Sequence, residues 1–360
     1  MTLDEQLVRS RLATVVDPHT GVDLVAGGSV RGIGIDGGKV AVELVLGYPA
    51  SSWHRALAEI AEAALRADPA ILGASVSVSS KIASHQVQKN LSPLPGVKNL
   101  IAVASGKGGV GKSTTAVNFA LALAAEGAKV GILDADIYGP SIPRMLGLSG
   151  RPDTQDGKRI VPMRGHGLEA MSIGVLIDED APMIWRGPMV TQALQQLLTE
   201  TAWGDLDYLI VDLPPGTGDI HLSLAQKAPV AGAIIVTTPQ DIALLDAKKA
   251  LKMFEKVEIP VLGIVENMAI HVCSNCGHAE HIFGHGGGER MAAQYDVPLL
   301  GSLPLDISIR EQADGGAPTV AAHPESSLAA AYREIARKTA AKLSLRAKNK
   351  AIAFPNVMLG

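Results

Sequence analysis

The strongest chemical signal in this 360-residue chain is a glycine-rich run, GKGGVGKST, at residues 106–114. Its spacing satisfies G-x-x-x-x-G-K-[ST], the pattern of a loop whose backbone N–H groups cradle phosphates. In such a loop Lys112 reaches the β- and γ-phosphates, and the hydroxyl of Ser113 binds Mg²⁺. The sequence therefore predicts an ATP and Mg²⁺ site made of Gly106, Lys107, Gly108, Gly109, Val110, Gly111, Lys112, Ser113 and Thr114.

Two acidic motifs further along the chain support a nucleotide site. Asp134 and Asp136 follow an apolar run in the segment LDAD, and Asp212 ends another apolar run in LIVDLPPG. Because parallel strands present their carboxyl ends at one sheet edge, these carboxylates are expected near Mg²⁺ and the attacking water. We predict that Asp212 holds the metal through water, that Asp136, or else Asp134, orients the attacking water, and that Gly216 offers its N–H to the γ-phosphate. Three elements in this order favour a phosphate site over a glycine-rich structural turn.

A pair of cysteines, Cys273 and Cys276, forms a C-x-x-C motif. Two thiolates on one turn can grip a soft metal centre, but two sulfurs do not complete the four-coordinate shell of zinc or of an iron-sulfur cluster. The remaining ligands would come from a second copy of the chain, or from His278, His281 or His285. From spacing alone a zinc knuckle ranks first, with a bridging cluster and a thiol redox switch as alternatives.

Alternating apolar runs and helical patterns are expected to position these residues. The apolar runs suit strands that are covered on both faces, and they lie at residues 100–104, 130–133, 208–211, 233–236, 261–265 and 299–303. Helical patterns lie between them at residues 113–126, 190–201 and 244–257. This alternation predicts an α/β fold with a doubly wound, mostly parallel sheet, as in P-loop NTPases.

A smaller α+β unit is predicted ahead of the sheet, over residues 1–90. It contains an alternating run at residues 40–46 and an alanine-rich helical pattern at residues 52–67. A linker at 91–98 belongs to a polar, proline-containing stretch, and the ATPase domain is expected at 99–350 with a tail at 351–360. The last helical pattern, at 326–347, has a narrow apolar face without Trp or Phe, so we expect it to pack on the protein rather than to anchor a membrane.

Composition excludes several classes of protein. The net charge is −4, with 32 basic and 36 acidic residues, so no global electrostatic attraction to nucleic acid or anionic lipid is expected. Two cysteines exclude a disulfide scaffold, and no apolar run is long enough for a membrane span or a secretory signal. These features predict a cytoplasmic protein with no nucleic-acid partner and no stable membrane association.

Lys107, an extra lysine at the start of the loop, is not needed by a single phosphate cradle. The run KGGVGKS resembles the pattern KGGxGK[ST] of the deviant Walker A group, whose members dimerise face to face. The resemblance implies a homodimer in which Lys107 contacts the nucleotide of the partner and contributes to catalysis with Lys112, Asp134, Asp136 and Asp212.

Within that group the chain resembles the Mrp/ApbC family of P-loop ATPases, thought to hold and deliver iron-sulfur clusters. The resemblance rests on CSNCGH at 273–278 and IFGHGGG at 282–288, with GPSIPRMLG at 139–147, WRGPM at 185–189, DLPPGTGD at 212–219 and VENM at 265–268. It implies a [4Fe–4S] cluster bound by Cys273 and Cys276 between two protomers, with apo iron-sulfur proteins and cluster-assembly factors as partners. It also implies that Asn267 contacts adenine. On this resemblance, an iron-sulfur cluster is favoured over zinc as the metal centre of the cysteine pair.

The segment DPHTGVDLVAGGSV at 17–30 resembles a small domain found ahead of these ATPases and alone in cluster-assembly proteins. That domain commonly carries a cysteine just after its central strands. The corresponding stretch here, YPASS at 48–52, has none, so docking is expected of this unit rather than cluster ligation.

Two other functions share the predicted phosphate site. One is an ATPase that positions cargo on membranes or DNA, and the other is an adaptor in which zinc only pins the dimer. The cysteine pair argues against the first, for which it has no evident use, and metal content separates the second from a cluster carrier.

Overall fold

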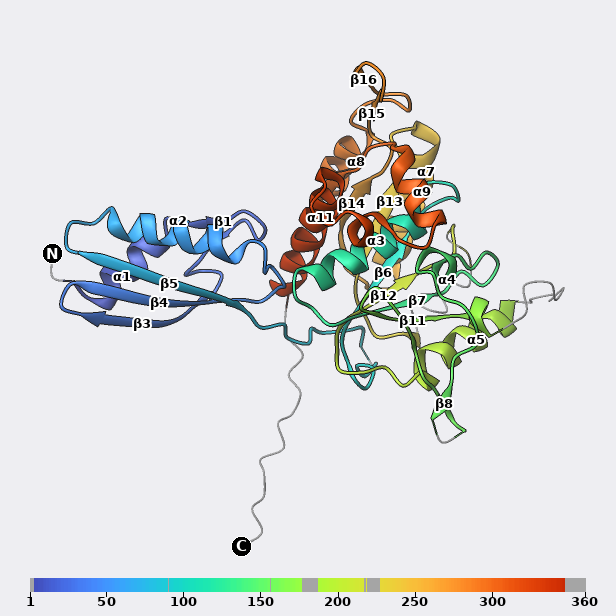
Figure 1. Ribbon diagram of the computed structural model, residues 1–360, viewed down its shortest axis with the longest axis horizontal. Helices are drawn as coiled ribbons and strands as arrows, with labels where there is room; N and C mark the ends of the chain where they lie inside the picture. The colour runs from blue at the N-terminus through green and yellow to red at the C-terminus, as the bar shows by residue number, and fades with distance from the viewer. Residues whose placement is uncertain are drawn as a thin grey trace, which may run out of the picture.

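The computed structural model describes residues 3–89, 91–155, 157–176, 187–216, 218 and 227–346 (Figure 1). The predicted tail at 351–360, the first two residues of WRGPM, and Thr217 and Asp219 of DLPPGTGD lie outside the described residues.

The larger part of the chain is built on an eight-stranded sheet in the order β10-β11-β7-β12-β6-β13-β14-β17. All neighbouring pairs are parallel except the edge pair of β10 and β11. The strands are β6 (Val97–Ala104), β7 (Val130–Asp134), β10 (Met163–Gly165), β11 (Leu168–Ser172), β12 (Leu206–Asp212), β13 (Val230–Thr237), β14 (Val261–Glu266) and β17 (Leu299–Ser302). This architecture confirms the predicted α/β class with a mostly parallel sheet.

Helices cover both faces of the sheet because successive strand residues point to opposite sides. Ile101 and Val103 of β6 share one core cluster with α3 (Lys112–Ala125) and α11 (Ser327–Ser344). Leu100 and Ala102 of the same strand share a second cluster with α5 (Gly187–Glu200) and α7 (Asp241–Lys256). The other elements of this part are α4 (Ile142–Met145), β8 (Thr154–Gln155), β9 (Arg159–Ile160), η1 (Ile173–Val175), β15 (His271–Val272), β16 (Ala279–Glu280), α8 (Gly287–Tyr295), α9 (Ile307–Asp314) and α10 (Thr319–Ala322).

Helix α11 buries the apolar face recognised in the sequence. Tyr332, Ile335, Ala336 and Leu343 are at most 1% exposed and belong to the core cluster that includes α3. Within the described residues, no helix is both long enough and apolar enough to cross a bilayer.

The N-terminal part is a small α+β unit, shown in blue in Figure 1. Its three-stranded sheet has the order β3-β4-β5, with β4 and β5 parallel and joined through α2. Apolar residues at every second position of β4 are buried, whereas the residues between them are more exposed. Its elements are α1 (Glu5–Leu12), β1 (Val16–Asp17), β2 (Val22–Asp23), β3 (Val30–Asp36), β4 (Lys39–Leu46), α2 (His54–Arg66) and β5 (Gly73–Ser80).

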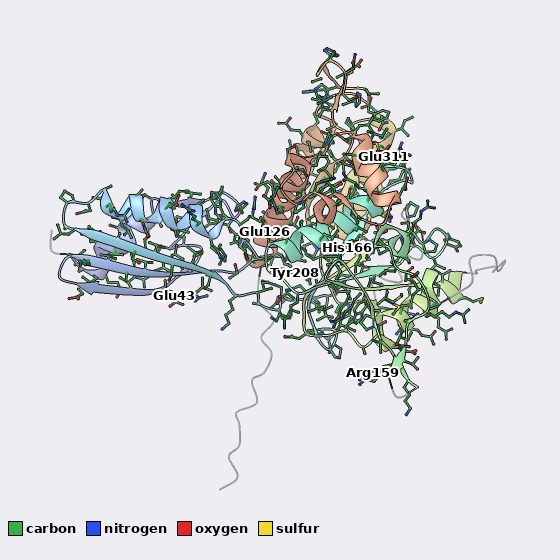
Figure 2. All side chains as sticks on the ribbon, viewed as in Figure 1. Glu43, Glu126, Arg159, His166, Tyr208 and Glu311 are labelled. Atoms are coloured by element: carbon green, nitrogen blue, oxygen red, sulfur yellow. The ribbon has the colours of Figure 1, made fainter. Side chains whose placement is uncertain are left out.

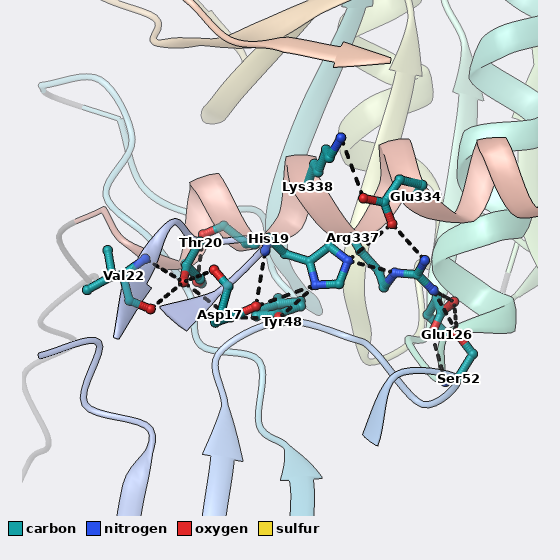
Figure 3. A network of polar contacts seen from close by, with 12 residues as sticks. Asp17, His19, Thr20, Val22, Tyr48, Ser52, Glu126, Glu334, Arg337 and Lys338 are labelled. Atoms are coloured by element: carbon teal, nitrogen blue, oxygen red, sulfur yellow. Dashed lines mark hydrogen bonds and ion pairs between the residues drawn. The ribbon is translucent and has the colours of Figure 1, made fainter. Parts of the chain in front are cut away.

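A polar network around Arg337 of α11 joins the two parts (Figure 3). Arg337 donates through Nη1 to Glu126 Oε1 at 2.8 Å and to Ser52 Oγ at 2.7 Å, and through Nη2 to Glu334 Oε2 at 2.8 Å. Its Nε lies 3.1 Å from His19 Nε2, and Glu126 also accepts from the backbone N–H of Ser52 at 3.0 Å. Figure 2 shows Glu126 where the N-terminal part meets the helices of the larger part. The cysteine-free stretch at 48–52 therefore contacts the end of α3, the helix that begins at the phosphate-binding loop.

Replacing Arg337 with alanine is expected to lower the free energy of unfolding by about 3 kcal/mol, because the buried Glu126 carboxylate loses its guanidinium partner. Urea denaturation of the nucleotide-free protein measures the change. Arg55→Ala is the matched control, since Arg55 is 92% exposed and pairs with Glu59 on the surface of α2, where about 0.5 kcal/mol or less is expected. Equal shifts in the two variants would show that the network does not stabilise the junction.

Candidate functional site

The glycine-rich run forms the loop between β6 and α3. Gly109 and Gly111 both have φ near +80°, a left-handed conformation that glycine adopts without strain. Gly111 is the N-cap residue of α3, and no side chain caps the helix there. The first N–H groups of α3 are therefore available to an anion, and the helix dipole favours negative charge at the same place.

Lys112 and Asp212 form a buried ion pair beneath this loop. Lys112 Nζ lies 2.5 Å from Asp212 Oδ1 and 3.1 Å from Ser113 Oγ, and the two charged side chains are 6% and 0% exposed. Asp212 Oδ2 is buried without a hydrogen-bond partner among the described residues. Burial raises the pKa of Asp212, while the Lys112 charge opposes the increase. An unpartnered carboxylate oxygen beside a hydroxyl suits a hard cation such as Mg²⁺, so these three residues fit the predicted metal-triphosphate site.

Asp134 is fully buried, and both oxygens of its carboxylate accept hydrogen bonds from neighbouring residues of the chain. Oδ1 accepts from the N–H of Asp136 at 3.1 Å, and Oδ2 accepts from the N–H groups of Ser141 and Ile142 at 3.0 and 3.1 Å and from Ser172 Oγ at 3.2 Å. Burial and the nearby Asp212 charge raise the pKa of Asp134. These contacts place Asp134 as the anchor of the turn at 136–142.

Asp136 is half-buried at the start of that turn. Burial raises the pKa of its carboxyl group, which Lys112 opposes. Asp134 already accepts four hydrogen bonds, and the Asp136 carboxylate accepts from the backbone N–H groups of Gly139 and Tyr138.

Lys107 and Gly216 lie at the mouth of the loop. Lys107 forms no ion pair with any described residue, while its carbonyl accepts from Ser105 Oγ at 2.9 Å. The N–H of Gly216 donates to the carbonyl of Ser105 at 3.1 Å. This bond would have to open before Gly216 could donate to a γ-phosphate.

Asn267 lies directly after β14, where its side chain contacts the phosphate-binding loop. Its Nδ2 donates to the carbonyl of Val110 at 2.9 Å. The family resemblance implied an adenine contact for this residue, and no local pattern indicated a contact with a loop 157 positions away.

The two cysteines lie on the turn between β15 and β16, a hairpin that projects at the top of Figure 1. The N–H of Cys273 donates to the carbonyl of His278 at 2.9 Å, and the N–H of Gly277 donates to the carbonyl of Cys273 at 2.8 Å. Cys273 is half-buried and Cys276 is exposed. Hydrogen bonds from the backbone N–H groups of Cys276 and Asn275 lower the pKa of the Cys273 thiol, which favours the thiolate that binds metal.

Two histidines near the turn, His281 and His285, contact each other and the backbone. The rings of His281 and His285 pack edge to face with centroids 4.7 Å apart, and His281 Nδ1 donates to the carbonyl of Ala269 at 2.7 Å. Among the described residues, no group of three or more His, Cys, Asp and Glu side chains could hold a metal ion. The turn thus presents two sulfur ligands.

Comparisons with known proteins agree with both parts of the structure. A family model described as NUBPL iron-transfer P-loop NTPase matches residues 96–340, and one described as iron-sulfur cluster assembly protein matches residues 5–78. Among solved structures, a nucleotide-binding protein of Archaeoglobus fulgidus in complex with ADP has a TM-score of 0.55 and 41% identity, covering 61% of this chain and 87% of that chain. The cell division ATPase MinD of Pyrococcus furiosus shares the fold, with a TM-score of 0.51, 24% identity, and coverage of 67% and 97%.

Curated relatives extend over most of the chain. The iron-sulfur cluster carrier protein of Escherichia coli strain K12 is 58% identical over 306 residues, 84% of this chain and 82% of that protein. The carrier protein of Haemophilus influenzae is 50% identical over 346 residues, 95% of this chain and 93% of that protein. These matches confirm the resemblance that the motifs indicated, and the chain belongs to the family of NUBPL iron-transfer P-loop NTPases.

Proposed function

We propose that this protein is an ATP-hydrolysing iron-sulfur cluster carrier of the cytoplasm. It assembles a [4Fe–4S] cluster between two copies of the chain and passes the cluster to apo-proteins with the help of cluster-assembly factors. The observation that carries the proposal is the exposed turn with two sulfur ligands, Cys273 and Cys276, in a chain whose relatives are cluster carriers.

The nucleotide site supports ATP hydrolysis through groups already close together. With a triphosphate bound, Lys112 would bind the β- and γ-phosphates instead of Asp212, and Ser113 and, through water, Asp212 would hold Mg²⁺. When bound there, Mg²⁺ would neutralise charge that develops on the phosphates. Asp136 orients the attacking water, and Lys107, which has no ion-pair partner among the described residues, reaches the phosphates held by the second copy.

Two copies complete the cluster site because each contributes two thiolates. A [4Fe–4S] cluster takes four cysteine ligands, and a two-fold axis through the hairpin turns supplies them. Cys276 is exposed in the single chain, so its sulfur is accessible to a cluster and to a second copy. Transfer to an acceptor protein would exchange the carrier's thiolates for those of the acceptor one at a time.

Iron, acid-labile sulfide and zinc measured per chain after anaerobic reconstitution test this proposal, with the oligomeric state recorded on the same sample. The expected result is about four irons and four sulfides per dimer. Zinc alone, or iron bound to a monomer, would contradict the bridging cluster.

A further inference from the structure

Asn267 lies between the phosphate-binding loop and the segment that leads to the cysteines. It is 8% exposed, its Nδ2 donates to the carbonyl of Val110 at 2.9 Å, and its own N–H donates to the carbonyl of Thr237 at 2.7 Å. A Cβ atom on Gly111 would lie 2.2 Å from Asn267 Nδ2, so the amide is in direct contact with the loop. A shift of the peptide group between Val110 and Gly111 would therefore change the contacts of the Asn267 side chain.

That peptide group also carries a donor for phosphate. The carbonyl of Val110 and the N–H of Gly111 belong to one planar trans peptide group and point in opposite directions. Holding the carbonyl on Asn267 thus sets the direction of the N–H, which is one of the donors of a phosphate-binding loop. A phosphate that attracts this N–H tilts the whole group and moves the carbonyl against the Asn267 amide.

The chain between Asn267 and Cys273 is short and fastened at successive residues. The N–H of Ala269 donates to the carbonyl of Leu303 at 2.9 Å, and the N–H of Leu305 donates to the carbonyl of Ile270 at 2.8 Å. His271 Nδ1 donates to the carbonyl of Leu305 at 3.1 Å.

The far limb of the hairpin is tied to the same segment, because His281 Nδ1 donates to the carbonyl of Ala269 at 2.7 Å. Hydrogen bonds therefore connect the segment that follows Asn267 to both limbs of the cysteine hairpin.

We propose that Asn267 is a positioning residue that couples nucleotide occupancy of the phosphate-binding loop to the geometry of the Cys273 and Cys276 thiols. The proposal rests on the proposed function, since it assigns the regulation of the same cysteine site. By linkage, a change in the state of the thiols alters nucleotide affinity by the same factor by which bound nucleotide alters the equilibrium between those thiol states.

The experiment measures maleimide alkylation of Cys273 and Cys276 in the reduced, metal-free protein, without nucleotide and with saturating Mg-ATP. We expect Mg-ATP to change the alkylation rate of the native protein by about fivefold or more, and the change to fall below about twofold in Asn267→Ala. Asn267→Leu fills a similar volume without a donor and is expected to behave like Asn267→Ala. Ser302→Ala removes a polar contact to Glu266 at the neighbouring strand end and is expected to keep the native response.

Nucleotide affinity, thermal unfolding and oligomeric state are recorded for every variant, so that each measurement is made on folded, saturated protein. A full nucleotide response in Asn267→Ala or Asn267→Leu would overturn the proposal. A native protein whose alkylation rate does not respond to Mg-ATP would also overturn the proposal. The proposal would be overturned as well if the response were lost only because the variant no longer dimerises.

A reciprocal measurement does not depend on any variant, because alkylating the native cysteines is expected to change the ATP affinity if the two sites are coupled. Unchanged affinity after alkylation contradicts the coupling. Because no cluster is present in these assays, failure of the proposed cluster chemistry would appear in the iron and sulfide analysis and not here.

Discussion

Replacing Lys112 with alanine is expected to lower ATP turnover by about 100-fold or more while the reconstituted cluster stays bound. The side chain is buried against Asp212 and beside Ser113, so its removal takes away the cation that meets the phosphates. It also leaves Asp212 buried without its charge partner, and because burial already raises the pKa of Asp212, the carboxylate becomes a weaker ligand for the water shell of Mg²⁺. Steady-state ATP hydrolysis and iron content on the same preparation measure the two effects.

Lys129→Ala serves as the control for the Lys112 variant. Lys129 is 68% exposed and its ammonium lies 3.4 Å from the Asp205 carboxylate, which is 74% exposed, so its removal is expected to change neither turnover nor iron content. In cells, Lys112→Ala should fail to replace the native protein although it carries a cluster. Loss of iron from purified Lys112→Ala would show that the nucleotide and cysteine sites are not separable.

Replacing either Cys273 or Cys276 with alanine is expected to abolish cluster binding, from about four irons per dimer to close to none. In a bridging site each single substitution removes two of the four sulfur ligands, because both copies carry the change. Iron and sulfide analysis, together with the visible absorption of the reconstituted protein, measures the loss. Ser274→Ala changes the same turn without removing a sulfur and is expected to keep the iron of the native protein.

Substitutions of the histidines near the turn distinguish a cluster that bridges two copies from a metal site within one chain. His281→Ala and His285→Ala are expected to retain iron, because the four sulfurs of two copies already complete the cluster. Iron or zinc that disappears with a histidine, and not with dimer dissociation, would instead place the metal within one chain.

Six of the eight strands of the large sheet, and the helices α3, α5, α7 and α11, could be predicted from the sequence. The run predicted at 233–236 is the centre of β13 (Val230–Thr237), and the helical pattern predicted at 113–126 is α3 (Lys112–Ala125) within one residue at each end. Strands covered on both faces are continuous apolar runs, which makes them visible without an alignment. The segment of β10 and β11 was not predicted, because its residues at 163–172 mix Arg, Gly, His and Glu with the apolar ones and lie at the sheet edge.

Motifs made of residues close together along the chain could be recognised without a structure. The phosphate-binding loop needs glycines, Lys112 and Ser113 within a few residues, and the C-x-x-C turn needs two cysteines three positions apart, so both are visible as local patterns. Only the tertiary structure decided which distant residues meet. Lys112 pairs with Asp212 at a separation of 100 positions, Asn267 reaches Val110 at 157, and Arg337 reaches Glu126 at 211. These contacts follow from strand order and helix packing, which bring chain segments together through buried apolar surface and leave no local signature at the polar residues that they place in contact.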